Sequence, residues 1–280
     1  MSKGLLDPKV DFVFKNIFGS PNHPEILISF LNATLKAKNK IVNVDIKKTD
    51  IEKQYIEDKY SRLDVKATTS NDEIINIEIQ LKNENNMVKR SLYYLSKMYE
   101  EQLNEKEDYS KLVRTVCINI LNFKYLKTDN FHTGYRFKEI ESNEELTDIM
   151  EVHFIEIPKL QDSSDEKDML VAWTEFLKDP ESEKVRGLEL SIEEIRQAKD
   201  ELIRMSNDST QRELYDMRAN SLRDKMSELN AAERKGIEKG REEGRKEEKI
   251  KIARNMKLSG LDTNTIAKIT NLSEDEIDKL

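Results

Sequence analysis

The sequence predicts an α/β core of about 160 residues followed by an all-helical region. Two observations support this class. Helical spacing of apolar residues over 8–38 gives way to alternation of apolar and polar residues from Ile41 onward, which is typical of strands. Beyond Pro158 the chain is rich in Glu, Lys, Arg and Leu, with Pro180 as its only proline, which is typical of helices.

The elements of the core are predicted in order. Residues 8–38 form helices, interrupted by the turn formers at 20–24. Strands and one long helix, at 87–107, follow; the predicted strands span 41–46, 62–68, 74–82, 114–122, 135–140 and 151–157. The run at 114–122 is almost continuously apolar, which indicates a strand covered on both faces. The apolar stripe of the long helix is expected to comprise Val88, Leu92, Leu95 and Tyr99.

Composition shifts divide the chain into four predicted segments. The α/β domain spans 1–160, and a polar, acidic connector leads from it to a helical region at 166–229. A charged helix with regularly spaced glycines follows at 230–258, and a pair of helices closes the chain at 262–280.

The charge is unevenly distributed. The formal net charge is −8, but residues 231–257 carry ten Lys/Arg and six Asp/Glu, a local +4 that leaves −12 for the remainder. Any contact with nucleic acid therefore depends on a local patch or a divalent metal rather than on the field of the whole protein.

Several classes of protein are excluded by composition. Cys117 is the only cysteine, which excludes an internal disulfide framework, and with three scattered histidines it cannot form a compact zinc site. No window approaches the roughly 18 apolar residues of a membrane span. The N-terminus reaches Asp7 before an apolar region forms, so no secretory signal is seen and we expect a cytoplasmic protein. No phosphate-binding loop or dinucleotide fingerprint is present, so no nucleotide cofactor is expected.

Two predicted strands around Asn71 carry the residues of greatest chemical interest. Asp64 lies in the strand 62–68 and Glu78 lies in the strand 74–82, each at a polar position between apolar neighbours. A hairpin centred on Asn71 pairs positions whose numbers sum to 142, which places Asp64 opposite Glu78.

Two opposed carboxylates need a partner, because directly opposed like charges destabilise a sheet. A hard divalent cation such as Mg²⁺ would supply it, since Mg²⁺ binds one or two protein carboxylates together with water and phosphate oxygens. Such an ion can activate water and stabilise charge on a phosphodiester. The alternative is a solvated strand face whose acids are neutralised by Arg62, Lys66 and Lys82.

A family resemblance favours the metal site. Asp64 is followed, after a short turn, by Glu78-Ile79-Gln80, and this pattern stands behind an N-terminal helix and before a long helix. It resembles the PD-(D/E)XK nuclease superfamily and, within it, the transposase-like branch, the recombination-promoting nuclease family of bacteria. Other segments carry the resemblance over most of the chain: residues 7–18, Arg90 with Tyr93, Tyr94 and Tyr99, residues 102–121, and the glycine-spaced helix.

The resemblance implies a restriction-endonuclease-like core, with a mixed sheet flanked by helices, in a bacterial, metal-dependent DNA endonuclease. Asp64 and Glu78 match the carboxylates that hold Mg²⁺ or Mn²⁺, and the backbone carbonyl of Ile79 matches a further ligand. Gln80 matches a catalytic position at which the superfamily usually has lysine.

Gln80 is a departure from the superfamily pattern that this branch shares. Glutamine can hydrogen-bond a water molecule but supplies no positive charge. Slow cleavage is therefore expected, with Lys66 or Lys82 on the same face supplying the charge. The alternative is a catalytically silent, nuclease-like module that binds DNA or a protein.

Four further polar residues are candidates for supporting roles: Asp11, Lys15, Arg90 and Gln102. Asp11, with Lys15 on the first predicted helix, would be an outer-sphere metal carboxylate, whereas the alternative is a solvated helix surface. Arg90 and Gln102, on the long helix, would reach a scissile phosphate or a bound water; the alternative is hydrogen bonding between elements.

The C-terminal segments predict association. Gly236, Gly240 and Gly244 would line a groove that lets a second helix approach, which favours a homodimer; the alternative is a flexible charged connector. The pair of helices at 262–280 resembles half of a DNA-binding helix-turn-helix, with a capping box from Ser273 to Glu276. A packing or dimerisation element is the alternative to a DNA reader.

Overall fold

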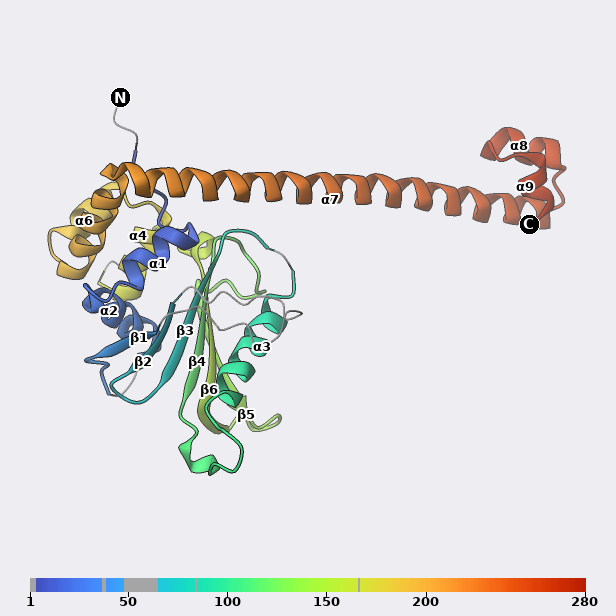
Figure 1. The fold of residues 1–280 in the computed structure, drawn as a ribbon. Helices are drawn as coiled ribbons and strands as arrows, with labels where there is room; N and C mark the ends of the chain where they lie inside the picture. Colours follow the sequence, from blue (N-terminus) through green and yellow to red (C-terminus); the bar gives the residue numbers. More distant parts are fainter. Residues whose placement is uncertain (1–3, 37–38, 48–64, 84, 166) are drawn as a thin grey trace. The chain divides into compact units, whose positions relative to one another are not determined.

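The computed structural model describes residues 4–36, 39–47, 65–83, 85–165 and 167–280. Within them, a mixed sheet flanked by helices is followed by helices alone (Figure 1). The predicted fold class is therefore confirmed. The chain divides into two compact units, Met1–Asp216 and Met217–Leu280, which are described separately.

The sheet combines parallel and antiparallel pairing. Among the described residues its strand order is β1-β2-β3-β4-β6-β5. Strands β3, β4 and β6 are parallel, whereas β1–β2, β2–β3 and β6–β5 are antiparallel. The strands are β1 (Val44–Lys47), β2 (Val65–Thr69), β3 (Ile74–Gln80), β4 (Thr115–Leu121), β5 (His132–Lys138) and β6 (Glu145–Glu156).

The predicted register of the β2–β3 hairpin is confirmed where the structure describes it. Val65 pairs with Ile77 and Lys66 pairs with Asn76, so that paired numbers sum to 142. A slip of one residue would move every apolar side chain to the other face, so the alternation of the two strands fixes their pairing.

The isoleucine face of the sheet is covered by helices from both ends of the first unit. Phe18 of α1 (Asp11–Phe18), Phe30 of α2 (Pro24–Leu35) and Trp173 of α4 (Met169–Lys178) are fully buried together. Their rings lie 5.3 Å (Phe18–Trp173) and 5.4 Å (Phe18–Phe30) apart. Helices α5 (Glu183–Glu189) and α6 (Glu193–Asn207) belong to the same unit.

Helix α3 (Met87–Glu100) covers the other face of the sheet (Figure 1). The predicted apolar stripe is wrong for Val88 and Leu92, which are exposed. The helix instead buries the side that carries Met87, Ser91 and Leu95. Met87 and Leu95 pack in an apolar cluster with residues of β4 and β6, and the Ser91 hydroxyl donates to the buried Asn119 of β4 (2.8 Å). The polar face of the sheet therefore places a serine on the buried side of the helix, and the spacing of apolar residues could not predict this. The helix is also shorter than the predicted 87–107.

The second unit consists of most of α7 (Ser209–Leu258) with α8 (Thr263–Thr270) and α9 (Glu274–Asp278). A small apolar core joins the end of α7 to the two short helices; it contains Ala253, Ile266, Leu272 and Ile277. The predicted capping box is present, since Ser273 Oγ accepts from the Glu276 amide and the Glu276 carboxylate accepts from the Ser273 amide.

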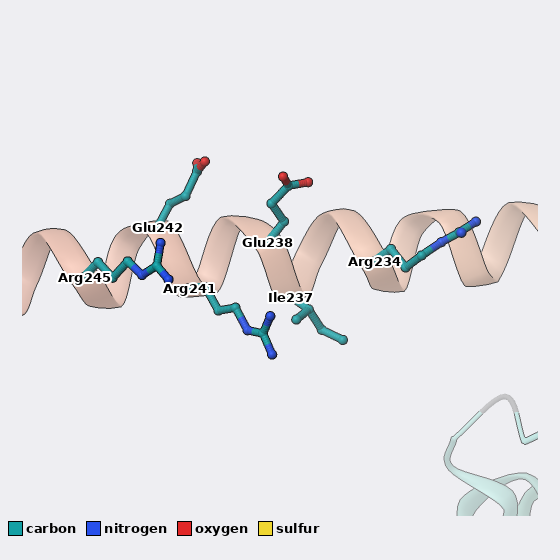
Figure 2. Close-up of a pocket in the computed structure, with 6 residues that line it drawn as sticks. All are labelled: Arg234, Ile237, Glu238, Arg241, Glu242 and Arg245. Atoms are coloured by element: carbon teal, nitrogen blue, oxygen red, sulfur yellow. The ribbon is translucent and has the colours of Figure 1, made fainter.

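The middle of α7 carries charged side chains in every direction. Figure 2 shows Arg234, Ile237, Glu238, Arg241, Glu242 and Arg245 along one stretch of the helix. All come from a single helix, so they form an open surface rather than an enclosed pocket. Space is also open at Gly236, Gly240 and Gly244, where an added Cβ would meet no atom of the described residues within 4 Å. Among the described residues, no helix is both long and apolar enough to cross a membrane.

Candidate functional site

Glu78 occupies a buried position on the polar face of β3. Alternation directs Asn76, Glu78 and Gln80 to the face that α3 covers, opposite to the isoleucines. Glu78 is 1% exposed and Asn76 is 0% exposed, whereas Gln80 is half-buried. A solvated strand face is therefore not the environment of Glu78. Asp64, its predicted partner, lies outside the described residues.

Arg90 of α3 brings a positive charge to Glu78. Its Nη2 lies 3.5 Å from Glu78 Oε2, and its side chain remains 31% exposed. The guanidinium carbon also lies 5.3 Å from the centre of the Tyr94 ring, within the range of a cation–π contact. A buried carboxylate is strongly unfavourable without a cation, so Arg90 helps to make this position tolerable. The structure thus brings together two of the predicted site residues.

The floor of the site, next to Glu78, is formed by β4. Asn119 pairs with Glu78 in the parallel register, and its side chain accepts from Ser91 and donates to the His153 carbonyl (3.1 Å). Burial, and then the neighbouring charge of Glu78, raise the pKa of the Cys117 thiol to about 12. Cys117 is therefore a neutral, inert group, as its place in an apolar strand predicts.

The remaining predicted site residues of the hairpin, Lys66, Lys82 and Ile79, lie on or just after the strands β2 and β3. Lys66, which pairs with Asn76, has its Nζ 3.8 Å from Glu101 Oε2. Lys82 is half-buried in the bend after β3. Ile79 is buried with its side chain on the isoleucine face.

Three residues predicted to support the site, Gln102, Asp11 and Lys15, have their described contacts with residues other than Glu78. The side chain of Gln102 donates to Thr115 Oγ1 (2.7 Å) and accepts from the Val113 amide (2.8 Å), so it ties the segment after α3 to the start of β4. Asp11 begins α1 and its carboxylate accepts from the Phe12 amide (2.7 Å). Lys15 lies exposed on the same helix.

Within the described residues, no group of three His, Cys, Asp or Glu side chains is placed to hold a metal ion. The described part of the site offers oxygen atoms, from the Glu78 carboxylate, the Asn76 amide and the backbone, and oxygen donors fit a hard cation such as Mg²⁺.

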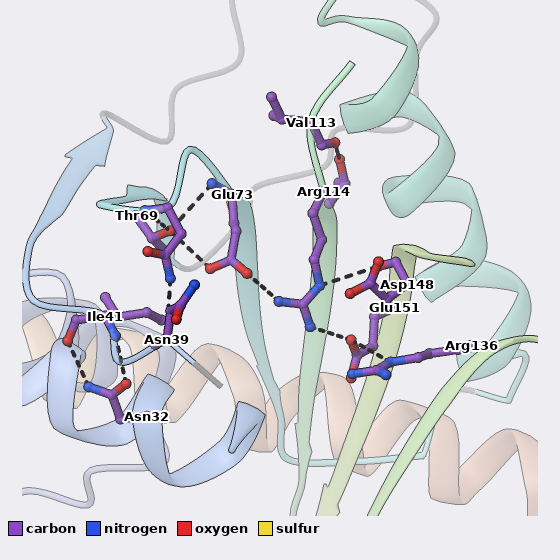
Figure 3. A network of polar contacts seen from close by, with 12 residues as sticks. Asn32, Asn39, Ile41, Thr69, Glu73, Val113, Arg114, Arg136, Asp148 and Glu151 are labelled. Atoms are coloured by element: carbon purple, nitrogen blue, oxygen red, sulfur yellow. Dashed lines mark hydrogen bonds and ion pairs between the residues drawn. The ribbon is translucent and has the colours of Figure 1, made fainter. Parts of the chain in front are cut away.

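A second buried polar cluster, which the sequence analysis missed, lies at the other end of β3. Arg114 bridges the carboxylates of Glu73 and Glu151, and Arg136 Nε donates to Glu151 (3.0 Å; Figure 3). Glu73 also accepts from Thr69 Oγ1 (3.0 Å). Burial alone would raise the pKa of Glu151, but hydrogen bonds from His153, Arg114 and Arg136 hold it at about 2.

Two histidines extend this cluster to the edge of the sheet. His153 bonds to Glu151 (2.7 Å) and to His132 (2.9 Å), and the two imidazole rings stack. Burial and then the neighbouring His153 lower the pKa of His132 to about 4. Gly134 faces His153, and an added Cβ there would lie 3.1 Å from the ring. Gly134 leaves room for the His153 ring, so this glycine was the sequence feature that could have indicated the cluster. It could not be recognised from the sequence, because it depends on the pairing of β5 with β6.

Two family models match the chain. A model of the PD-(D/E)XK nuclease family transposase matches residues 8–232. A second model, of the C-terminal HTH domain of the Rpn/YhgA-like nuclease family, matches residues 246–280. No curated protein and no solved structure matched the chain.

Proposed function

The chain belongs to the PD-(D/E)XK nuclease transposase family, and on that premise we propose that it is a DNA endonuclease that depends on Mg²⁺ or Mn²⁺. The observation that carries the proposal is the buried carboxylate of Glu78, held on a central strand beside Arg90. A carboxylate in this setting is costly for stability, and perturbed or buried charges concentrate at functional sites.

Asp64 and Glu78 hold the metal ion in this proposal, with the backbone carbonyl of Ile79 as a further ligand. Asp64 directly precedes Val65, which pairs with Ile77, the residue before Glu78. When bound, the ion activates water and stabilises the charge that develops on the phosphodiester.

The other side chains bind and orient the reactants. Gln80 hydrogen-bonds the attacking water, and Lys66 and Lys82 supply the positive charge that glutamine lacks. Arg90 is suited to bind the scissile phosphate, since a guanidinium matches two phosphate oxygens and this one is partly exposed beside Glu78.

The second unit contributes DNA contact and dimerisation in this proposal. The helix-turn-helix at 246–280 belongs to a class that binds DNA. A second copy of α7 would pack against the open glycine positions at 236, 240 and 244. Two nuclease sites in one dimer could then act on two strands.

Plasmid nicking by the purified full-length protein tests the nuclease. Nicking is expected with Mg²⁺ or Mn²⁺ but not with EDTA, and Asp64→Asn and Glu78→Gln are each expected to abolish it. Glu100→Gln, at an exposed position of α3, is the matched control and should leave it unchanged. Nicking that survives both site variants would refute the assignment. Metal-independent DNA binding without any nicking would favour the silent module instead.

Sedimentation analysis tests the dimer. The wild-type chain is expected to sediment as a dimer. Gly236→Gln, Gly240→Gln and Gly244→Gln together would fill the open side of α7 with polar side chains, block the close approach of a second helix and yield monomers. A monomeric wild type, or a triple variant that remains dimeric, would contradict the proposed interface.

A further inference from the structure

Asn76 is a buried amide that the proposed mechanism does not use. It lies two residues before Glu78 on the same face of β3, between Lys66 of β2 and Cys117 of β4 in the sheet register. The side chain is 0% exposed. Its Nδ2 lies 3.9 Å from Cys117 Sγ, whereas its Oδ1 has no hydrogen-bond partner within the described part of the chain.

The neighbouring strand provides an internal comparison. Asn119 is also 0% exposed, yet its oxygen accepts from Ser91 and its nitrogen donates to the His153 carbonyl. Within the described residues, one buried amide of this layer has hydrogen bonds at both its oxygen and its nitrogen, whereas the oxygen of the other has no partner. An unsatisfied buried acceptor costs about 1–3 kcal/mol, which a solely structural amide would not be expected to incur.

The position of Asn76 beside Glu78 indicates which kind of donor its Oδ1 would accept a hydrogen bond from. Oδ1 is an acceptor in a layer that already contains the Glu78 carboxylate, so a further carboxylate there would add repulsion while a neutral oxygen does not. The water molecules that Mg²⁺ and Mn²⁺ retain in proteins are strong donors, and outer-shell acceptors orient them.

We propose that Asn76 is a positioning residue of the metal site, whose Oδ1 accepts a hydrogen bond from a water molecule on the ion that Glu78 holds. This inference rests on the proposed function. It assigns Asn76 to metal binding rather than to contact with DNA.

Titration calorimetry of the full-length protein with Mn²⁺ alone, without DNA, tests the inference. Asn76→Leu removes the acceptor at similar volume and is expected to weaken Mn²⁺ binding roughly 10- to 100-fold, the usual effect of removing an outer-shell partner. Asn76→Thr keeps a neutral oxygen acceptor at similar volume and is expected to retain most of the binding. Thr174→Val, which removes a buried hydroxyl in α4, is the matched control and should bind as wild type does.

Thermal melting without metal separates this role from a structural one. Since Asn76→Leu removes an unsatisfied buried acceptor, its melting temperature should equal or exceed that of the wild type. A structural role predicts the opposite result: a lower melting temperature and unchanged Mn²⁺ affinity. If leucine prevents folding, Asn76→Ala provides the same comparison.

The outcomes distinguish this inference from the function on which it rests. Wild-type Mn²⁺ affinity in Asn76→Leu, with binding lost in Glu78→Gln, would overturn the role of Asn76 and leave the metal site intact. A wild-type protein that binds no Mn²⁺ would overturn both.

Discussion

Replacing Arg114 by methionine is expected to destabilise the first unit substantially. Arg114 neutralises Glu73 and Glu151, whose side chains are only 8% and 4% exposed. Removing one partner of a buried ion pair costs about 3–5 kcal/mol, because an uncompensated charge remains. Glu151 keeps Arg136 and His153, whereas Glu73 keeps only Thr69 among the partners described above. Only one of the two carboxylates, Glu73, thus loses its described cation, so we expect the lower end of that range.

About 3 kcal/mol corresponds to a fall in melting temperature of roughly 6–12 °C for a unit of this size. Circular dichroism melting at pH 7 would measure it. The matched control is Arg196→Met, which breaks an exposed pair with Glu193 on α6 and should cost less than about 1 kcal/mol. If Arg114→Met melts within the range of that control, the buried carboxylates do not depend on Arg114 and the reasoning is wrong.

The pH dependence provides a second readout of the same change. The pKa of Glu151 is about 2 in the folded protein, below its ordinary 4.5, so its ionic contacts stabilise the fold fully above pH 4.5. That stabilisation is lost as the pH falls towards 2. Arg114→Met removes one of the contacts, so the gap between wild-type and variant melting temperatures should narrow over this interval. A gap that stays constant from pH 5 to pH 2 would contradict the assignment.

Three further predictions concern other parts of the chain. Gly134→Ala should lower the free energy of unfolding in urea by about 1–3 kcal/mol, because the new Cβ would press on the His153 ring that two hydrogen bonds hold in place. Gly187→Ala, in α5 where space is open, is the control and should leave that free energy unchanged or raise it. Equal effects of the two substitutions would refute the clash. Cys117 should resist a disulfide reagent at pH 8 until the protein unfolds, since its pKa of about 12 leaves almost no thiolate; rapid native labelling would disprove its burial. Ser273→Ala should destabilise α9 by about 1 kcal/mol, seen as faster amide exchange at 274–278, and unchanged exchange would show that the cap is dispensable.

Local patterns were sufficient to predict much of the fold. The alternation of residues 62–82 predicted the β2–β3 register, because only one pairing keeps the isoleucines on one face. The same alternation placed Glu78 on the polar face. It could not predict that this face is buried, since the cover comes from α3.

Interactions between distant strands could not be predicted in this way. Arg114 lies 41 residues from Glu73 and 37 from Glu151 in the chain, and no periodicity links them. The exposed Val88 illustrates the same limit, because the partner surface of a helix decides which side it buries. The sequence predicted only that Asn76 lies on the polar face of its strand. Its unusual state is recognised by comparison with Asn119, a buried amide of the same layer whose hydrogen bonds are described.

The packing of Trp173 against Phe18 has a consequence for synthesis of the protein on the ribosome. Helix α1 is made before α4, and Trp173 follows Phe18 by 155 residues in the sequence. At a translation rate of about 5–20 residues per second, the apolar side of the nascent α1 waits roughly 10–30 s for that partner. During this interval the apolar side of α1 lacks the tryptophan that buries it, so the aromatic core of the first unit can close only after α4 has been made.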